Sequence, residues 1–183
     1  MTDILDIEEY LKVLFQSLTL PELKTICKEL EIKGYSKYKK VDLVDFVINS
    51  MSDEERKIIL AQKELEIIAK EINSGIQIIR GFGQEKIDEI RIRPKNGTTI
   101  EVLFKGFNWE TESYLELSQD TLQNPERDCD CRVGSENGLC PHFWINVIIA
   151  IKKEIISIND WSFTKLPDNF HPQIQNLTIP KLD

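Results

Sequence analysis

Three of the four cysteines and one of the two histidines of this chain lie within fourteen residues. They form the pattern Cys129-x-Cys131, eight intervening residues, and Cys140-x-His142. A disulfide between Cys129 and Cys131 would be strained, and three cysteines cannot all pair among themselves. Three thiolates and one imidazole are instead the donor set of a closed structural zinc site, which leaves no open position for catalysis. We therefore expect these four residues to bind one structural Zn²⁺; the alternative is a cluster of unligated core cysteines.

The residues around this pattern fit a metal-bound loop that leads into a helix. Gly134 and Gly138 allow the chain to turn back between the two ligand pairs. Pro141 suits a first helical turn, and an apolar run follows from Phe143 to Ile151. The pattern predicts a helix that begins at the second ligand pair, where the helix dipole would favour the thiolates.

This spacing, followed by an apolar helix, resembles the SWIM-type zinc finger. The resemblance covers about residues 78–157 and implies a β-β-α unit whose strands precede the Cys-x-Cys pair. The segments "EIRIRPKNGTTIEVLFKGF" and "ESYLELS" supply alternating strands here, with Asn96-Gly97 as a predicted hairpin turn. Members often carry an alanine three residues after the histidine, where this chain has Ile145. Such modules are implied to bind DNA or proteins.

A second pattern lies near the N-terminus, in "LTLPELKTICKELEIKGYSKYKKVDLVDFVINSM". Thr19-Leu-Pro-Glu22 forms a capping box that predicts a helix. Gly34 interrupts the helical pattern, Ser36 is a candidate cap for a second helix, and apolar residues recur over residues 41–48. About residues 17–51 resemble the SAP or Rho N-terminal class of helix-extended-helix module. This resemblance implies DNA or RNA binding, or protein docking in some members.

The connection between these two helices carries the best nucleic-acid candidates of the chain. It places positive charges beside two rings on which a base could stack. The candidates are Lys33, Tyr35, Lys37, Tyr38, Lys39 and Lys40. Neutralising about four phosphates would give weak, salt-sensitive binding. The alternative is that the tyrosines pack the module's core and the lysines are only solvated. Arg91 and Arg93 share one face of a predicted strand, where they either contact nucleic acid or form a solvated face.

Charge gives different expectations for the two halves of the chain. The formal net charge is −8, so binding to nucleic acid must rest on a local patch. Residues 108–138 contain eight acidic residues and only two arginines. Zinc with three thiolates adds one more negative charge. We therefore expect the zinc half to repel phosphate and to bind a protein partner.

A long helix is predicted between the two modules, over residues 52–77. Ser52 and Glu55 repeat the capping-box pattern, and Gly75 is a candidate C-terminal end. Apolar residues recur every three or four positions here and in the first helix. These seams are Ile58, Ala61, Leu65, Ile68 and Ile72, and Ile4, Ile7, Leu11, Leu14 and Leu18. We expect the two helices to pack within one chain; pairing between two chains is the alternative.

The last segment, residues 158–183, has three prolines and no sustained period. It predicts an irregular tail anchored by Trp161, Phe163 and Phe170. Cys27 lies on the apolar side of a predicted helix and is interpreted as a core residue, and His171 as an ordinary loop residue.

Together these patterns predict an α+β protein with a helical domain (1–51), a connecting helix (52–77), a zinc-binding domain (78–157) and the tail. The chain has no phosphate-binding loop, metalloprotease motif or strained-turn serine, so we expect no enzyme. It shows no signal pattern, and its longest apolar stretch is too short for a bilayer, which predicts a soluble, cytoplasmic protein.

The expected function is that of a zinc-binding accessory protein. Its N-terminal module would associate with DNA or RNA, and its zinc domain would dock on a protein complex. The main alternative is a pure protein adaptor without direct nucleic-acid contact. An enzyme with reactive, metal-free thiols is the least favoured class.

Overall fold

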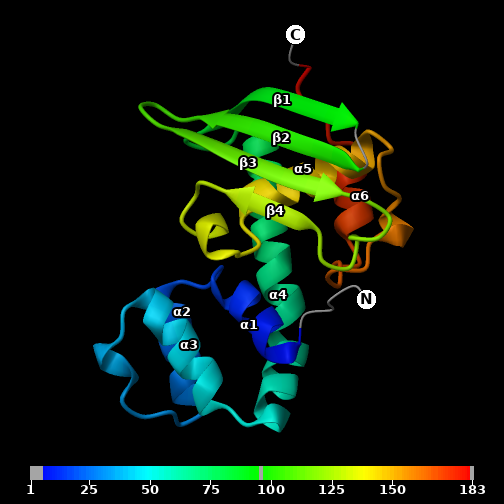
Figure 1. Ribbon diagram of the computed structural model, residues 1–183. Helices are drawn as coiled ribbons and strands as arrows, with labels where there is room; N and C mark the ends of the chain where they lie inside the picture. Colours follow the sequence, from blue (N-terminus) through cyan, green and yellow to red (C-terminus); the bar gives the residue numbers. More distant parts are fainter. Residues whose placement is uncertain (1–5, 95–96, 182–183) are drawn as a thin grey trace.

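The computed structural model describes residues 6–94 and 97–181 and has a mixed α+β fold (Figure 1). The helices are α1 (Ile7–Phe15), α2 (Leu20–Glu29), α3 (Lys40–Ser50), α4 (Asp53–Ile79), α5 (Pro141–Lys152) and α6 (Phe170–Gln175). The antiparallel sheet has the order β1 (Lys86–Pro94), β2 (Thr98–Lys105), β3 (Glu110–Leu117) and β4 (Glu126–Cys129). The predicted fold class is confirmed. Ile4 of the N-terminal seam and Asn96 of the predicted hairpin turn lie outside the described residues.

The long helix α4 links the two halves of the molecule. Figure 1 shows α1 beside its first part, α2 and α3 beyond α1, and the sheet in front of its last part. One face of the sheet packs on α5 and α4, and the residues of β2 that point there, Ile100, Val102 and Phe104, are fully buried as their alternation predicts. The opposite face of the sheet is open to solvent.

The prediction that Gly75 ends this helix is wrong. The capping box at its start is present, since Ser52 and Glu55 exchange side-chain and backbone hydrogen bonds. Gly75, however, lies inside the helix, where α5 approaches closely. A Cβ atom on Gly75 would lie 2.9 Å from the Pro141 carbonyl oxygen and 3.2 Å from Cγ1 of Ile145. Glycine therefore permits the two helices to pack at this distance.

The predicted seam of α4 is only partly correct. Ile68 and Ile72 are buried, but Ile58 and Leu65 are 53% and 44% exposed. A straight helix has 3.6 residues per turn, so residues spaced at 3.5 drift away from the contact face. The expected packing of α1 on α4 within one chain is observed.

The module between residues 17 and 51 has the two predicted helices. Thr19 and Glu22 form the capping box of α2, and Gly34 has a φ of +81°, which glycine adopts without strain. Ser36 does not cap α3, because it lies inside a 3₁₀ turn (Tyr35–Lys37), and Lys39 holds the N-cap position without a side-chain hydrogen bond. The apolar side of α3 closes the small core with Leu43, Val44, Val47 and Ile48, whereas Val41 is exposed.

The tail is anchored as predicted, but it is not irregular throughout. Trp161, Phe163 and Phe170 are buried. Residues 170–175 form α6, because Phe170 and Ile174 lie one turn apart and both enter the core, and Pro172 is tolerated in a first helical turn. No helix among residues 6–94 and 97–181 is both long and apolar enough to cross a membrane.

Candidate metal centre and nucleic-acid interface

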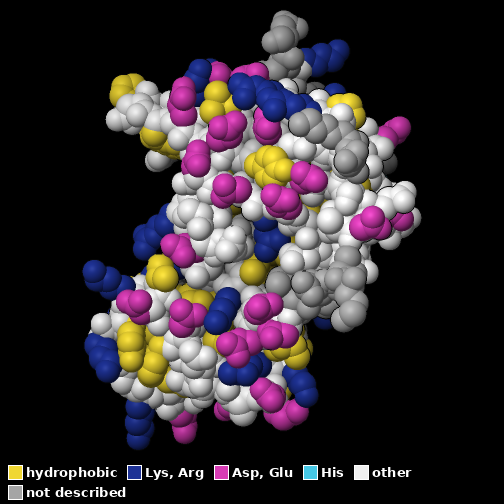
Figure 2. Space-filling model, viewed as in Figure 1, with side chains coloured by type: hydrophobic (Ala, Val, Ile, Leu, Met, Phe, Trp, Pro, Cys, Tyr) yellow, Lys and Arg dark blue, Asp and Glu magenta, His cyan; other side chains and the backbone are white. Residues whose placement is uncertain are grey.

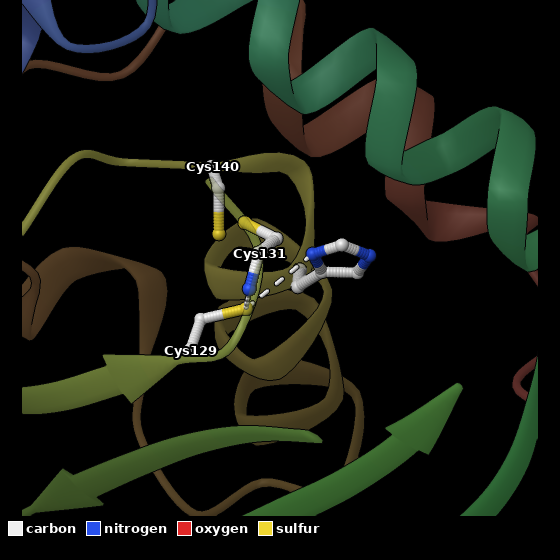
Figure 3. A group of neighbouring side chains, drawn as sticks. Cys129, Cys131 and Cys140 are labelled. Atoms are coloured by element: carbon white, nitrogen blue, oxygen red, sulfur yellow. Dashed lines mark hydrogen bonds between the residues drawn. The ribbon is translucent and has the colours of Figure 1, made fainter. Parts of the chain in front are cut away.

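The structure brings the four predicted metal ligands together. Cys129 ends β4, Cys131 follows it, Cys140 is the N-cap of α5, and His142 lies in the first turn of that helix. The one ligand atom that each residue offers lies within 4.8 Å of the other three. Figure 3 shows the sulfur atoms of the three cysteines directed toward one another, with an imidazole ring beside them. This arrangement is compatible with a zinc site.

Backbone donors and neighbouring thiols surround the sulfur atoms of the cluster. Backbone N–H groups of Cys131, Gly134 and Phe143 donate hydrogen bonds of 3.2–3.5 Å to the three thiols. Hydrogen bonds with Cys129 and Cys140 lower the pKa of Cys131 far below its usual range. Hydrogen bonds with Cys129 and Cys131, together with burial, raise the pKa of Cys140 well above that range. A divalent cation would remove this conflict because it stabilises all three thiolates at once.

Glu85 is a member of this site that the sequence did not predict. Its Oε1 atom lies 3.0 Å from Nε2 of His142, and its side chain is only 12% exposed. Nδ1 of the same ring faces Sγ of Cys129 at 3.5 Å. With Nε2 bound to the carboxylate, Nδ1 is the atom that would bind a metal, as in other carboxylate–histidine–metal arrangements. Burial lowers the pKa of His142, but bonds to Cys129, Cys131 and Glu85 raise it to about 11, so metal binding would displace a proton.

No local pattern points to Glu85, because it lies 57 residues before His142. The only available signal was the general rule that a metal-ligating histidine pairs its second nitrogen with a carboxylate or carbonyl. That rule does not select one among the 31 acidic residues of the chain.

The loop between the ligand pairs also contacts the helical half. The Ser17 hydroxyl donates to the Leu139 carbonyl at 3.4 Å, and Gly138 packs between Val133 and Gln16 so closely that a side chain there would collide with both. A metal bound by the four residues would therefore hold this loop against the end of α1.

The candidate nucleic-acid residues of the module are divided between its surface and its core. Lys33, Lys37 and Lys39 are exposed. Tyr38 is half-buried and stacks on Phe46, with ring centroids 4.4 Å apart. Tyr35 is also half-buried against the core.

Lys40 differs from the other three lysines because its Nζ donates to the Gln16 carbonyl. Burial lowers its pKa, and so does the nearby charge of Arg132. Lys33, Lys37 and Lys39 thus remain exposed to solvent, with Nζ of Lys37 lying 5.1 Å from the centroid of the Tyr38 ring.

Arg91 and Arg93 lie on the outer face of β1, as their spacing predicts. Arg91 makes two hydrogen bonds of 2.6 and 2.7 Å to Glu89, and Arg93 lies 3.0 Å from Glu101. Figure 2 shows many acidic side chains over this face of the sheet. They line a hollow with Tyr114 and comprise Glu101, Glu112, Glu126, Asp128 and Asp130. The charge of both arginines is therefore compensated within the chain.

The sequence predicts no site role for Cys27 or His171, and both lie in ordinary positions. Cys27 is fully buried in the module's core, and His171 is exposed on α6.

Comparison with known families finds one match. The family described as Rho termination factor, N-terminal domain, matches residues 14–55. This segment contains α2, α3 and the start of α4, and it fits the module that the sequence resembles. No curated protein and no solved structure matches the chain.

Proposed function

We propose that this protein is a non-catalytic accessory protein that contacts nucleic acid through its N-terminal module and docks on a protein through its zinc half. The observation that carries the proposal is the match of residues 14–55 to the Rho N-terminal domain. The three exposed lysines, Lys33, Lys37 and Lys39, support it because they lie within seven residues of one connecting segment. Each could neutralise one phosphate, so the module alone binds weakly and loses affinity as salt rises.

The second half is a SWIM-type zinc finger in this proposal. Strands precede the Cys-x-Cys pair, and the Cys-x-His pair opens α5, as the resemblance implies. Its departure from the family pattern has a structural explanation: Ile145 is larger than alanine, and Gly75 provides the space opposite it. When bound, the metal would cross-link β4, the loop and α5. Four protein ligands would leave it no open position, which is why we propose no catalytic role.

The proposal is tested by titrating labelled single-stranded RNA, single-stranded DNA and duplex DNA with the zinc-loaded protein at low and physiological salt. The test variant changes Lys33, Lys37 and Lys39 to Glu and leaves Lys40 intact, because its bond to the Gln16 carbonyl is structural. We expect this variant to bind at least about tenfold more weakly and to show a smaller salt dependence, by about 2 in the log–log slope.

The matched control changes three exposed lysines outside the module, Lys57, Lys153 and Lys181, to Glu. It alters the net charge equally and should retain most of the affinity. Equal losses in the two variants would show only a general charge effect and would contradict a specific interface. Absence of binding by the parent protein at low salt would contradict the proposal altogether.

The acidic outer face of the sheet favours a second candidate, a protein adaptor without nucleic-acid contact. Its carboxylates already compensate Arg91 and Arg93 and would repel phosphate. If no nucleic acid binds, the adaptor becomes the better explanation for both halves.

A further inference from the structure

The exposed aromatic side chains of this protein are all at one end of the sheet. Among residues 6–94 and 97–181, the exposed Phe, Tyr and Trp residues are Phe82, Phe107 and Trp109, with 69%, 99% and 40% exposure. Phe82 lies just before β1, and the other two lie in the turn between β2 and β3. These segments meet because Lys105, at the end of β2, pairs with the first residue of β1 and the first residue of β3. Such clustering indicates a binding surface rather than scattered apolar residues.

Backbone hydrogen bonds fix the two segments that carry these rings. The Gly106 N–H donates to the Trp109 carbonyl at 2.9 Å, which closes the turn. The indole ring lies so close to Gly106 that a Cβ atom there would overlap it. Phe82 follows the end of α4, and its N–H donates to the Gln77 carbonyl at 2.9 Å. Because its ring packs on its own turn, Trp109 loses little conformational entropy on binding.

Among the described residues, the charged side chains at this end of the sheet that form no ion pair are positive. Lys105 is paired with Asp88 at 2.8 Å and with Glu110 at 3.7 Å. Arg80 and Lys86, on either side of Phe82 in sequence, are exposed and form no ion pair with any described residue. Exposed rings beside cations match the chemistry of a single-stranded nucleic acid, whose bases stack on the rings while its phosphates approach the cations.

We infer that this aromatic end, formed by Phe82, Phe107 and Trp109 with Arg80 and Lys86, is a second contact for single-stranded nucleic acid. The inference rests on the proposed function, because it gives the weak N-terminal module a partner site. The two sites are joined by α4, whose 27 residues span about 40 Å at about 1.5 Å per residue. A strand that reaches both sites binds with the avidity of two linked contacts, whereas a short oligonucleotide engages one.

The test uses the full-length, zinc-loaded protein and labelled single strands of about 8 and about 30 nucleotides. The aromatic variant changes Phe82, Phe107 and Trp109 to Ala, and its circular dichroism and zinc content are compared with those of the parent because the indole of Trp109 packs on Gly106. The control changes two exposed apolar residues of α4, Ile58 and Leu65, to Ala.

We expect the aromatic variant to bind the longer strand at least about tenfold more weakly, with an unchanged salt slope, because stacking is not a counterion effect. The control should bind like the parent. Binding should also quench the fluorescence of Trp109, the exposed tryptophan, and this change should be absent in Trp109→Phe.

The other possible results distinguish a failure of this inference from a failure of the proposed function on which it rests. Full affinity in the aromatic variant, together with loss of binding in the Lys33, Lys37 and Lys39 variant, overturns the inference and leaves the proposed function intact. Equal losses on a duplex and on a single strand overturn the stacking assignment. No binding by the parent to either strand overturns both proposals.

Discussion

The N-terminal module and the zinc half of this molecule are stabilised by different means. The module is closed by a small, mainly aliphatic core between α2 and α3, centred on Leu23, Leu43 and Val47, and it exposes lysines. The zinc half combines a sheet, an aromatic core around Trp144 and a Cys/His cluster, and it exposes carboxylates on its open face. We therefore propose that a metal stabilises the second half, because the loop of residues 130–139 contains few apolar residues that could pack it against the fold.

The largest expected effect tests this difference directly. Cys140→Ser removes the proposed ligand that also caps α5, and zinc sites of this kind contribute on the order of 10 kcal/mol to folding. We expect the variant to bind well under one equivalent of zinc and to lose hydrogen-exchange protection in the sheet and α5. Protection in α2 and α3 should persist. Unchanged hydrogen-exchange protection in the second half would contradict a structural role of the metal.

The reverse experiment weakens the module and leaves the metal in place. Leu23 is fully buried in α2, so Leu23→Ala should cost about 3 kcal/mol through lost burial and the cavity that remains. Denaturant unfolding measures the loss, and zinc content should stay at one equivalent. Lys28→Ala, on the exposed side of the same helix, is the control and should change stability by less than about 0.5 kcal/mol. Zinc loss in Leu23→Ala would show that the two halves are not separately stabilised.

A smaller effect is expected at Glu85, which acts on the metal site from outside the ligand set. Glu85→Ala should weaken zinc binding about 10- to 100-fold in competition with a chelator, since the carboxylate orients His142. Glu85→Gln should recover part of the affinity because its carbonyl can still accept from Nε2. Gln84→Ala, at the exposed neighbouring position, should bind zinc like the parent. Equal affinities in all three variants would leave Glu85 without a positioning role.

The comparison of the two halves also shows what the sequence can reveal. Capping boxes, alternating strands and ligand spacing are local signals, and they predicted α2, the start of α4, β2 and the start of α5. The four-residue strand β4 has no β-branched residue and forms because it pairs with Ser113 to Glu116 of β3. Glu85 contacts a residue of a distant segment, and the carboxylates that bind Arg91 and Arg93 lie beside them on the face of the sheet. Such contacts depend on tertiary structure, so composition and spacing do not contain them.

Gly75 makes a further tertiary contact that the local sequence pattern did not predict. Its substitution by alanine is expected to have the smallest effect on stability. Gly75→Ala should raise helix propensity by about 1 kcal/mol. It should nevertheless destabilise the protein by about 1 kcal/mol, because the new Cβ would meet the Pro141 carbonyl oxygen at 2.9 Å and Ile145 at 3.2 Å. Ser74→Ala, on the exposed side of the same turn, is the control and should not destabilise in this way.

A double-mutant cycle identifies the cause. Ile145→Ala alone should cost about 3 kcal/mol, because Ile145 is fully buried. Combined with Gly75→Ala, it should cost less than the sum of the two changes by about 1 kcal/mol, since α5 can then move away from the new methyl group. Denaturant unfolding of the four proteins gives this coupling energy. A coupling near zero would mean that the glycine at position 75 accommodates the backbone of α5 alone, and that Ile145 occupies the usual alanine position without compensation from α4.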